Sequence, residues 1–288
     1  MLAALAVLAL FVAAVMLVGN KNRVVVTGKD HAELFRKLLP FAEAGDRRAQ
    51  YSLGMLYFQG LGTDQDDRAA VEWIRRAAEK GYAPAQDQLG VLYHKGRGVE
   101  RSDVVAKEWM HKAAEQGDAT AQFNLAVLLD SGMTIRRDDP AARALVERIS
   151  QADAPAHLKQ WEQASLRDES EAIRWYEKAV AQGHRAAHIN LGNMLRERDS
   201  AYQDYGRAMK LYEAVANLRE EALEGQEEVL AVVFARYNIA IMYERGQKVL
   251  PNPERAKEWR CKAVAAGRRL PKMPWIVASD AKECPAAD

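Results

Sequence analysis

The hydrophobic and polar positions of this chain recur with a period of 36 residues. This step separates four sets of identical residues: Gln50, Gln86 and Gln122; Leu53, Leu89 and Leu125; Gly45, Gly81 and Gly117; and Trp73 and Trp109. A fixed period of this size is typical of stacked helical pairs, because one pair cannot bury its apolar face without its neighbours. The pattern therefore predicts an elongated array of repeats.

Each repeat contains two predicted helices, which we call the A helix and the B helix. In the first unit, Leu53 and Tyr57 lie on one stripe of the A helix, and Trp73 and Ala77 lie on the matching stripe of the B helix. A packing glycine such as Gly54 lets the partner helix approach closely, and other glycines end the helices with positive φ. The predicted ends are Gly60, Gly96 and Gly246 for A helices and Gly81, Gly117, Gly183 and Gly267 for B helices.

The run AQYSLGMLYFQGLGTDQDDRAAVEWIRRAAEKG at residues 49–81 strongly resembles a Sel1-like repeat, a relative of the tetratricopeptide repeat. Residues 83–117 match equally well, and the resemblance covers about residues 34–267. It implies an all-α fold, a right-handed α-solenoid of about 12 to 14 helices with the A helices along its concave face.

The later chain departs from the regular spacing. Residues 139–151 align as a B helix with Leu145 at the Trp place, and a Glu-rich insertion of about 11 residues before Ala235 predicts an extended helix or helical loop. We expect the first packed helix to begin near Asp30. The predicted boundaries are an anchor or signal segment at 1–20, a linker at 21–30, the solenoid at 31–267 and a C-terminal tail or cap at 268–288.

Residues 1–18, MLAALAVLALFVAAVMLV, carry no charge and would form a helix of roughly 27 Å, long enough to cross a bilayer. No basic residue precedes this run and no A-x-A site follows it, which favours an uncleaved transmembrane anchor over a signal peptide. Lys21, Arg23 and Lys29 come next, and by the positive-inside rule they would place the repeats in the cytoplasm.

The two cysteines favour the opposite orientation. Cys261 is predicted on an exposed helix face, and Cys284 lies in a proline-punctuated tail that could fold back over it. A disulfide between them would need an oxidising compartment, whereas two separate reduced thiols would not. We therefore expect an inner-membrane anchor with the soluble part in the bacterial periplasm, while the cytoplasmic orientation stays open.

Charge and motifs argue against several function classes. The 41 basic and 40 acidic residues nearly cancel, so no electrostatic footprint for nucleic acid is present. His184 and His188 are four apart on a predicted helix, but no third ligand is suggested nearby, and we predict no metal site. Ser279 and Lys282 match S-x-x-K in an irregular tail without companion motifs. We predict no catalytic residue, no cofactor and no small-molecule substrate.

What remains is a protein-binding surface on the A helices. By resemblance to tetratricopeptide arrays, A-helix positions that packing does not use point into a concave groove, where aromatic residues and Arg tend to act as anchors. Met55, Val91, Val127 and Ile241 are explained as well by packing against the next A helix. The predicted partner-binding residues are Tyr51, Phe58, Gln59, Asp87, His94, Lys95, Phe123, Asp130, Asn193, Arg196, Tyr237, Glu244 and Arg245.

The sequence therefore predicts a non-catalytic, membrane-tethered module that holds another protein. Bacterial Sel1-like proteins include immunity proteins that neutralise secreted antibacterial effectors such as phospholipases, and a small, near-neutral, envelope-tethered solenoid suits that role. One alternative is an envelope assembly scaffold, adaptor or regulator. Another is a penicillin-binding-type hydrolase, for which Ser279 and Lys282 would be the candidate residues.

Overall fold

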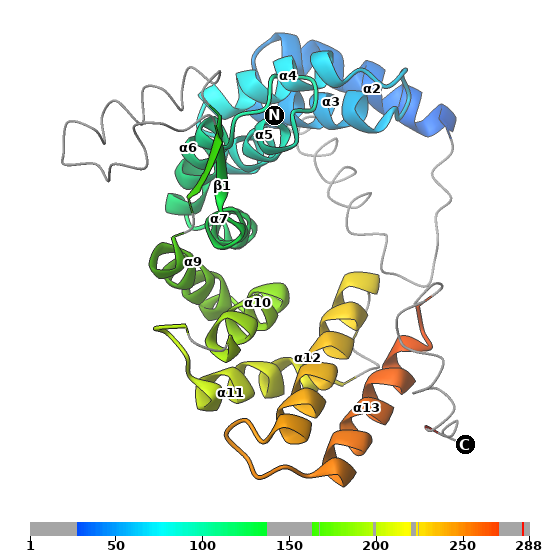
Figure 1. Cartoon of the computed structure of the whole chain (residues 1–288). Helices are drawn as coiled ribbons and strands as arrows, with labels where there is room; N and C mark the ends of the chain where they lie inside the picture. Colours follow the sequence, from blue (N-terminus) through cyan, green and yellow to red (C-terminus); the bar gives the residue numbers. More distant parts are fainter. Residues whose placement is uncertain are drawn as a thin grey trace, which may run out of the picture. The chain divides into compact units, whose positions relative to one another are not determined.

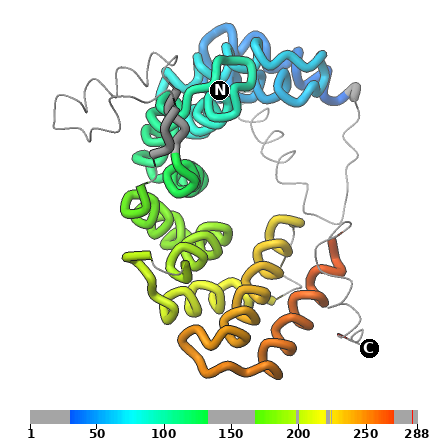
Figure 2. The backbone as a smooth tube through the Cα atoms, in the orientation of Figure 1, coloured from blue at the N-terminus to red at the C-terminus, as the bar shows by residue number. Residues whose placement is uncertain are grey.

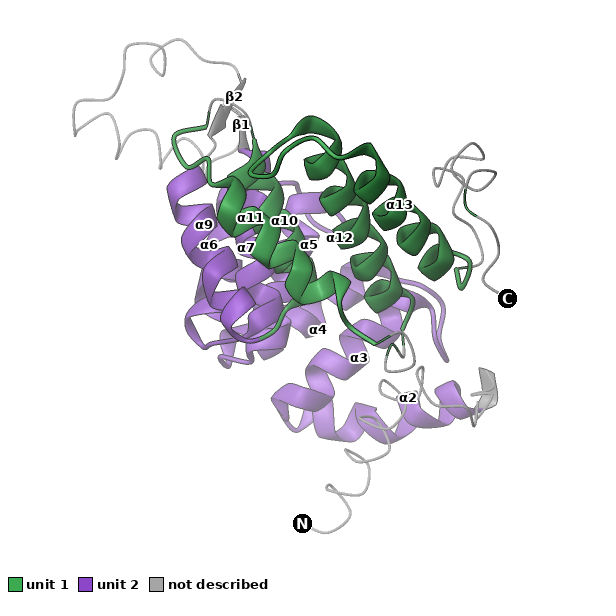
Figure 3. Cartoon of the chain, turned by 90° about the horizontal axis from the view of Figure 1, so that it is seen from below, with its two compact units in different colours: residues 1–25, 183–288 green, residues 26–182 purple. Residues whose placement is uncertain are grey.

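The computed structural model describes residues 28–136, 163–166, 168–197, 200–219, 223, 225–270 and 284. Their contacts divide them into two compact units (Figure 3). We call the residues up to Gln182 the N-terminal unit and those from Gly183 onward the C-terminal unit.

The N-terminal unit is built from successive antiparallel helices and one short ribbon (Figure 1). Its helices are α2 (Gly28–Glu43), α3 (Arg47–Gln59), α4 (Asp67–Glu79), α5 (Ala83–Lys95), α6 (Asp103–Glu115), α7 (Ala119–Ser131) and α9 (Glu169–Ala181). Strands β1 (Met133–Arg136) and β2 (Gln163–Leu166) pair antiparallel, with Met133 opposite Leu166. Each helix from α2 to α7 packs against the next one in the chain.

The C-terminal unit consists of α10 (Arg185–Arg196), α11 (Tyr205–Ala216), α12 (Gln226–Arg245) and α13 (Pro253–Gly267). Figure 2 shows the chain running along α12 and returning beside it along α13. α12 begins nine residues before Ala235 and confirms that the Glu-rich insertion extends a helix. Its buried residues occupy several faces, because α10, α11 and α13 all pack against it.

In each described repeat, the same hydrogen-bonded connection links the A helix to the B helix. We call this connection the joint. The residue before each B helix caps it: the side chains of Asp66 and Ser102, for example, accept hydrogen bonds from backbone N–H groups of α4 and α6. The backbone N–H of that capping residue donates to a carbonyl near the end of the preceding A helix. The five joints are Asp66 to Tyr57, Ser102 to Tyr93, Asp168 to Leu129, Asp204 to Leu195 and Asn252 to Tyr243.

The joint from Asp168 to Leu129, 3.1 Å long, shows that α9 is the B helix of α7. The two helices also pack against each other. The B helix that the sequence predicts at residues 139–151 lies outside the described residues. Among the described residues, α9 thus holds the B position beside α7.

Glycines fulfil the two roles that the period predicts. A Cβ atom at Gly54 would lie 2.6 Å from Ile74 Cγ1 and 3.0 Å from the Ala70 carbonyl oxygen, so only glycine permits this approach of α3 and α4. Gly60, Gly96 and Gly246 end A helices in the left-handed region, as predicted. α13 ends at Gly267, as predicted, but this glycine is its last helical residue and the C-cap is Arg268 in the right-handed region. The B-helix glycines 81, 117 and 183 have positive φ.

A buried amide ladder links consecutive repeats of the N-terminal unit. Gln86 Nε2 donates to the Ala78 carbonyl at the end of the preceding B helix, and Gln50 and Gln122 make the same bond to Ala42 and Ala114. Gln116 in turn donates to Gln86 Oε1, 2.6 Å away. Each of these carbonyls also accepts the backbone N–H of the glycine that follows its helix, so the recurring glutamine adds a second donor that ties the next repeat to it.

The remaining predictions concern the fold class, the start of the first helix, the membrane segment and the C-terminal tail. The described part of the chain is helical except for the ribbon of β1 and β2, so the all-α expectation needs this one exception. α2 begins at Gly28, two residues before the predicted start. The apolar run 1–18 lies outside the described residues, and no helix within them is long and apolar enough to span a membrane. Ser279 and Lys282 also lie outside them.

Candidate protein-binding face

The predicted binding residues of the N-terminal unit lie on its three A helices, α3, α5 and α7. Tyr51, Asp87 and Phe123 occupy the same repeat position on these helices, one period apart. Tyr51 and Phe123 are half-buried, and Asp87 is only 8% exposed. We call these three residues, with Phe58 and His94, the A face.

Asp87 is a buried carboxylate held by one amide. Asn124 Nδ2 on α7 donates to both carboxylate oxygens, over 3.1 Å and 2.9 Å. Burial raises the pKa of Asp87 to about 7, the bond from Asn124 opposes that shift, and the nearby carboxylate of Asp118 adds to it. The pair therefore joins the second repeat to the third through a group that titrates near neutral pH.

Tyr51 lies against a second tyrosine at the start of the next repeat. Its ring meets the ring of Tyr82 edge to face, with centroids 5.5 Å apart, and the Arg47 guanidinium lies 5.8 Å from the centre of the Tyr82 ring. Burial raises the pKa of Tyr51 to about 12, with Asp87 among the charges that contribute. The phenol is therefore neutral and serves as an aromatic surface.

Phe58 is covered by an arginine from the following repeat. The Arg97 guanidinium lies 3.9 Å from the centre of the Phe58 ring, Arg97 Nε donates to Asp67 over 2.8 Å, and a terminal nitrogen of Arg97 donates to the Phe58 carbonyl. The bond from Arg97 lowers the pKa of Asp67. One face of this predicted anchor is thus already occupied by the protein's own cation.

The other predicted residues of this unit fall into two groups. His94 Nδ1 lies 2.7 Å from Asp103, a buried carboxylate that Arg101 also contacts. Gln59 and Lys95, at the same place in two successive repeats, are exposed.

The third repeat uses its predicted residues to contact α9. The ring of Phe123 lies 6.0 Å from that of Tyr176, and the Tyr176 hydroxyl donates to Asp130 over 3.5 Å. Tyr176 is fully buried, so these contacts belong to the packing of α7 against α9.

In the C-terminal unit, the predicted residues lie on α10 and α12. Asn193 accepts a 2.8 Å hydrogen bond from the Tyr212 hydroxyl, and the guanidinium of Arg196 lies 6.0 Å from the centre of the same ring. Burial raises the pKa of Tyr212. Tyr237 is half-buried on α12. Near the end of that helix, Glu244 pairs with Arg260 over 3.2 Å, and Arg245 is exposed.

The histidines act as structural residues. His184 caps α10 by accepting a hydrogen bond from the Ala187 N–H, and His188 Nδ1 lies 3.0 Å from the His184 carbonyl oxygen. Within the described ranges, no group of three or more His, Cys, Asp or Glu side chains could hold a metal ion. The spacing of His184 and His188 therefore reflects the start of α10.

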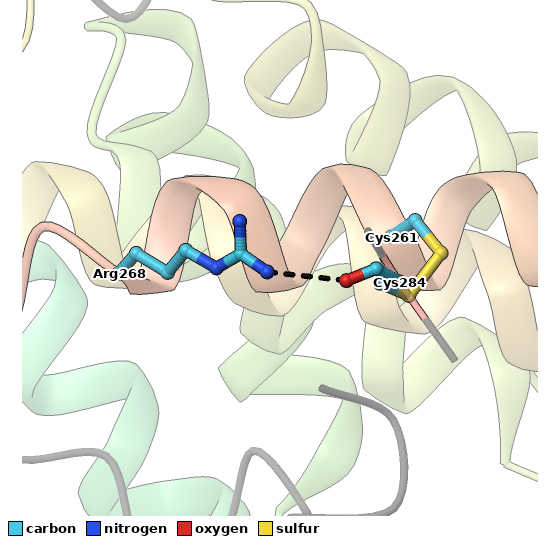
Figure 4. The surroundings of a disulfide bond; sticks show 3 residues. All are labelled: Cys261, Arg268 and Cys284. Carbon is cyan, nitrogen blue, oxygen red and sulfur yellow. Dashed lines mark hydrogen bonds between the residues drawn. A yellow bond between two sulfur atoms is a disulfide. The ribbon is translucent and has the colours of Figure 1, made fainter. Parts of the chain in front are cut away.

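Cys261 and Cys284 are joined by a disulfide bond in the C-terminal unit, which Figure 4 shows together with Arg268. Their Cα atoms are 5.1 Å apart. Cys284 is buried, and its carbonyl accepts a 3.1 Å hydrogen bond from Arg268, just after α13. These contacts hold the chain at Cys284 against the last helix.

Sequence reasoning missed the residues that bond to the predicted ones. Asn124 and Arg97 each reach into the preceding repeat, and neither is among the predicted binding residues. The available signal was the period itself: Asn124 is equivalent to Ser52 and Gln88, so all three repeats have a polar residue beside the A-face position. Such a recurring polar site on a packed helix indicates an inter-repeat hydrogen bond.

Joined helical pairs, a repeated amide ladder and glycine-limited helix approaches define a helical-repeat protein that forms an interaction scaffold. The Sel1 repeat model matches residues 47–82, 83–118, 119–153, 162–184, 185–218 and 233–267, which together exceed half of the chain. The chain therefore belongs to the Sel1 repeat proteins, as its sequence had indicated. Sel1 repeats bind other proteins and are in general non-catalytic.

Solved structures similar to this chain include two Sel1 repeat proteins and an immunity protein. A Sel1 repeat protein from Oxalobacter formigenes is 25% identical with a TM-score of 0.60, over 83% of this chain and 78% of that one. A putative Sel1 repeat protein from Klebsiella pneumoniae is 20% identical, with a TM-score of 0.44 over 86% and 96% of the two chains. Immunity protein Pa5087 from Pseudomonas aeruginosa is 14% identical, with a TM-score of 0.41 over 82% and 73%. No curated protein matches the chain.

Proposed function

We propose that this protein is a non-catalytic binding module that holds a partner protein against the A face of its N-terminal unit. The observation that carries the proposal is a set of half-buried aromatic rings on the first and third repeats, on either side of Asp87 in the row: Tyr51 and Phe58 on α3 and Phe123 on α7. Rigid, partly buried aromatic residues are the usual anchors of protein interfaces, and exposed polar residues such as Gln59 and Lys95 are typical of the rim.

The proposal extends to the envelope as the place and to a secreted antibacterial effector as the partner. The bond between Cys261 and Cys284 supports an oxidising compartment, since such bonds rarely persist in a reducing cytosol. The apolar run 1–18 supports a membrane tether, with the repeats on the periplasmic side. An immunity protein in this position meets its effector where the effector acts.

Capture followed by substitution tests the binding proposal. The full chain carrying an affinity tag is used to capture partners from its native host, and the capture is repeated with Tyr51→Ala and Phe123→Ala. Tyr202→Ala is the matched control, since Tyr202 is an exposed tyrosine that belongs to the C-terminal unit. We expect each A-face change to weaken binding at least tenfold. Equal recovery by all variants that retain the helical circular dichroism spectrum would refute the assignment of the A face.

Growth and stoichiometry separate the immunity role from the scaffold role. An immunity protein should form a one-to-one complex with its effector and restore growth when both are expressed in the periplasm. A scaffold should instead bring together two or more envelope proteins and leave effector toxicity unchanged. Rescue that is lost with Tyr51→Ala but kept with Tyr202→Ala would assign the immunity role to the A face.

A further inference from the structure

We propose that Asp87 is the receptor for a basic side chain of the partner, an arginine or a lysine that enters between α3 and α7 beside Tyr51. This inference rests on the proposed function and specifies the chemistry of the same face. It concerns the N-terminal unit alone, because Asp87, Tyr51, Tyr82 and Asn124 all belong to that unit.

The first argument is the unmatched charge of Asp87. The side chain is 8% exposed, and its hydrogen bonds come from the neutral amide of Asn124. A second carboxylate, Asp118, lies near enough to raise the pKa of Asp87 further. A carboxylate removed from water in this way is costly unless a positive charge joins it. A guanidinium or ammonium group would supply that charge together with N–H donors.

The second argument is the aromatic surface beside Asp87. Elsewhere in the described chain, all four described helical Trp rings and one Phe ring lie under the protein's own Lys or Arg. These pairs are Arg76 over Trp73, Arg97 over Phe58, Lys112 over Trp109, Lys178 over Trp175 and Lys262 over Trp259. Arg47 lies over Tyr82, and Tyr82 meets Tyr51 edge to face. Tyr51 thus offers a ring next to a carboxylate, the combination that a cationic side chain prefers.

The surroundings of Asp87 identify what else could control its charge. Tyr51 on α3, Tyr82 before α5 and Asp118 before α7 share its environment. The charged contacts from the two B helices lie at the other end of α5: Arg75 of α4 reaches Tyr93, and Asp103 of α6 reaches His94. At 1.5 Å per residue these contacts lie about 9 Å or more from Asp87 along the helix. None of these groups places a cation at Asp87.

Ionisation of Asp87 gives the interaction a characteristic pH dependence. Because the pKa of Asp87 is about 7, roughly a tenth of the carboxyl groups are ionised at pH 6 and roughly nine tenths at pH 8. A bound cation requires the ionised form. The affinity for a basic ligand should therefore be about tenfold higher at pH 8 than at pH 6.

The experiment uses the intact protein and argininamide as the probe. The carboxyl carbon of Asp87 is followed by 13C NMR through a pH titration, with and without argininamide at millimolar concentration, and N-acetyl-leucinamide is the uncharged control. We expect argininamide alone to lower the titration midpoint of Asp87, and to bind about tenfold more tightly at pH 8 than at pH 6. A midpoint that argininamide leaves unchanged would overturn the inference.

Substitutions separate this inference from the proposed function. Asp87→Asn should abolish argininamide binding, whereas Glu72→Gln, which removes an exposed carboxylate of α4, should not. Circular dichroism at both pH values verifies that each variant is folded. If a captured partner binds wild type and Asp87→Asn equally well, the binding module stands and the role of Asp87 is refuted. If Tyr51→Ala also leaves that partner bound, the A face itself is refuted.

Discussion

The two units fill the same structural position with different side chains. In the N-terminal unit, the position of Gln86 holds a glutamine that donates to the last turn of the preceding B helix. In the last repeat, the equivalent residue is Arg236, whose Nε donates to the Ala216 carbonyl and whose Nη1 donates to Lys262. The comparison teaches that glutamine and arginine can both donate to that carbonyl, and that the longer side chain also reaches α13.

The loops after the A helices show a second difference of this kind. Gly98 has a φ of 72°, and a Cβ atom there would collide with the Asp67 carbonyl of the preceding B helix. Lys248 has a similar φ of 68° in the corresponding loop. Its side chain lies over Gly206, near the start of α11, where the missing side chain provides the space. A left-handed residue is thus kept in both units, and in the N-terminal unit both Gly98 and the equivalent Gly62 closely approach the backbone of a neighbouring helix.

The largest effect should come from Gly98→Val. A β-branched residue is strained at this φ, and its Cβ meets backbone that cannot turn aside, so we expect a loss of about 4 kcal/mol of unfolding free energy. Lys248→Gly should be neutral or stabilise the protein by up to about 1 kcal/mol, because it relieves the left-handed conformation. Urea unfolding measures both, and a Gly98→Val protein as stable as wild type would contradict the collision.

The next largest effect should come from removing the disulfide bond, which belongs to the C-terminal unit. Only the C-terminal unit contains the bond between Cys261 and Cys284, which closes a loop with a sequence separation of 23 residues. Replacing both cysteines by serine should destabilise this unit by about 3 kcal/mol. Native-state hydrogen exchange should show faster exchange in α12 and α13 and no change in α3 to α6. Uniform acceleration through all these helices would show that the two units unfold together.

A smaller effect should come from changing Arg236, which donates to the carbonyls of Ala216 and Lys262. Arg236→Ala leaves the carbonyls of Ala216 and Lys262 without their donor, which should cost about 2–3 kcal/mol. Arg236→Gln should recover part of that loss, since glutamine makes the bond to the preceding B helix in the N-terminal unit. Thermal unfolding compares the two. If Arg236→Gln is no better than Arg236→Ala, the two positions are not equivalent.

The period of 36 made most of the fold predictable, since it fixed the helix pairs and most glycine helix ends. It did not predict that α9 would pack beside α7, because α9 follows α7 only after a long intervening segment. It also did not predict that Gly267 would be the last residue of α13, with Arg268 as the C-cap. Both features depend on contacts between segments, which spacing within one segment does not contain.

The binding face was predictable in position but not in its bonding. The period places Tyr51, Asp87 and Phe123 on one row, and the structure shows that Asp87 is bound by Asn124 and that Arg97 covers Phe58. These partners come from the following repeat, so their identity depends on how far a side chain reaches across the stack. The burial of Asp87 without a partner cation among the described residues likewise depends on several helices together.

The smallest effect concerns Asp87, the titrating group of the N-terminal unit. Its pKa of about 7 in the folded protein exceeds the ordinary carboxyl value of 3.8, so folding favours the protonated form. The stability contributed by that proton is complete below about pH 4, declines as the pH rises towards 7 and is lost above it. Asp87→Asn should remove this dependence and raise the unfolding free energy at pH 8 by on the order of 2 kcal/mol, with little change at pH 4. Urea unfolding across this range measures the difference, and Glu72→Gln serves as the exposed-carboxylate control. A constant gap between wild type and Asp87→Asn at every pH would mean that Asp87 does not titrate in this window.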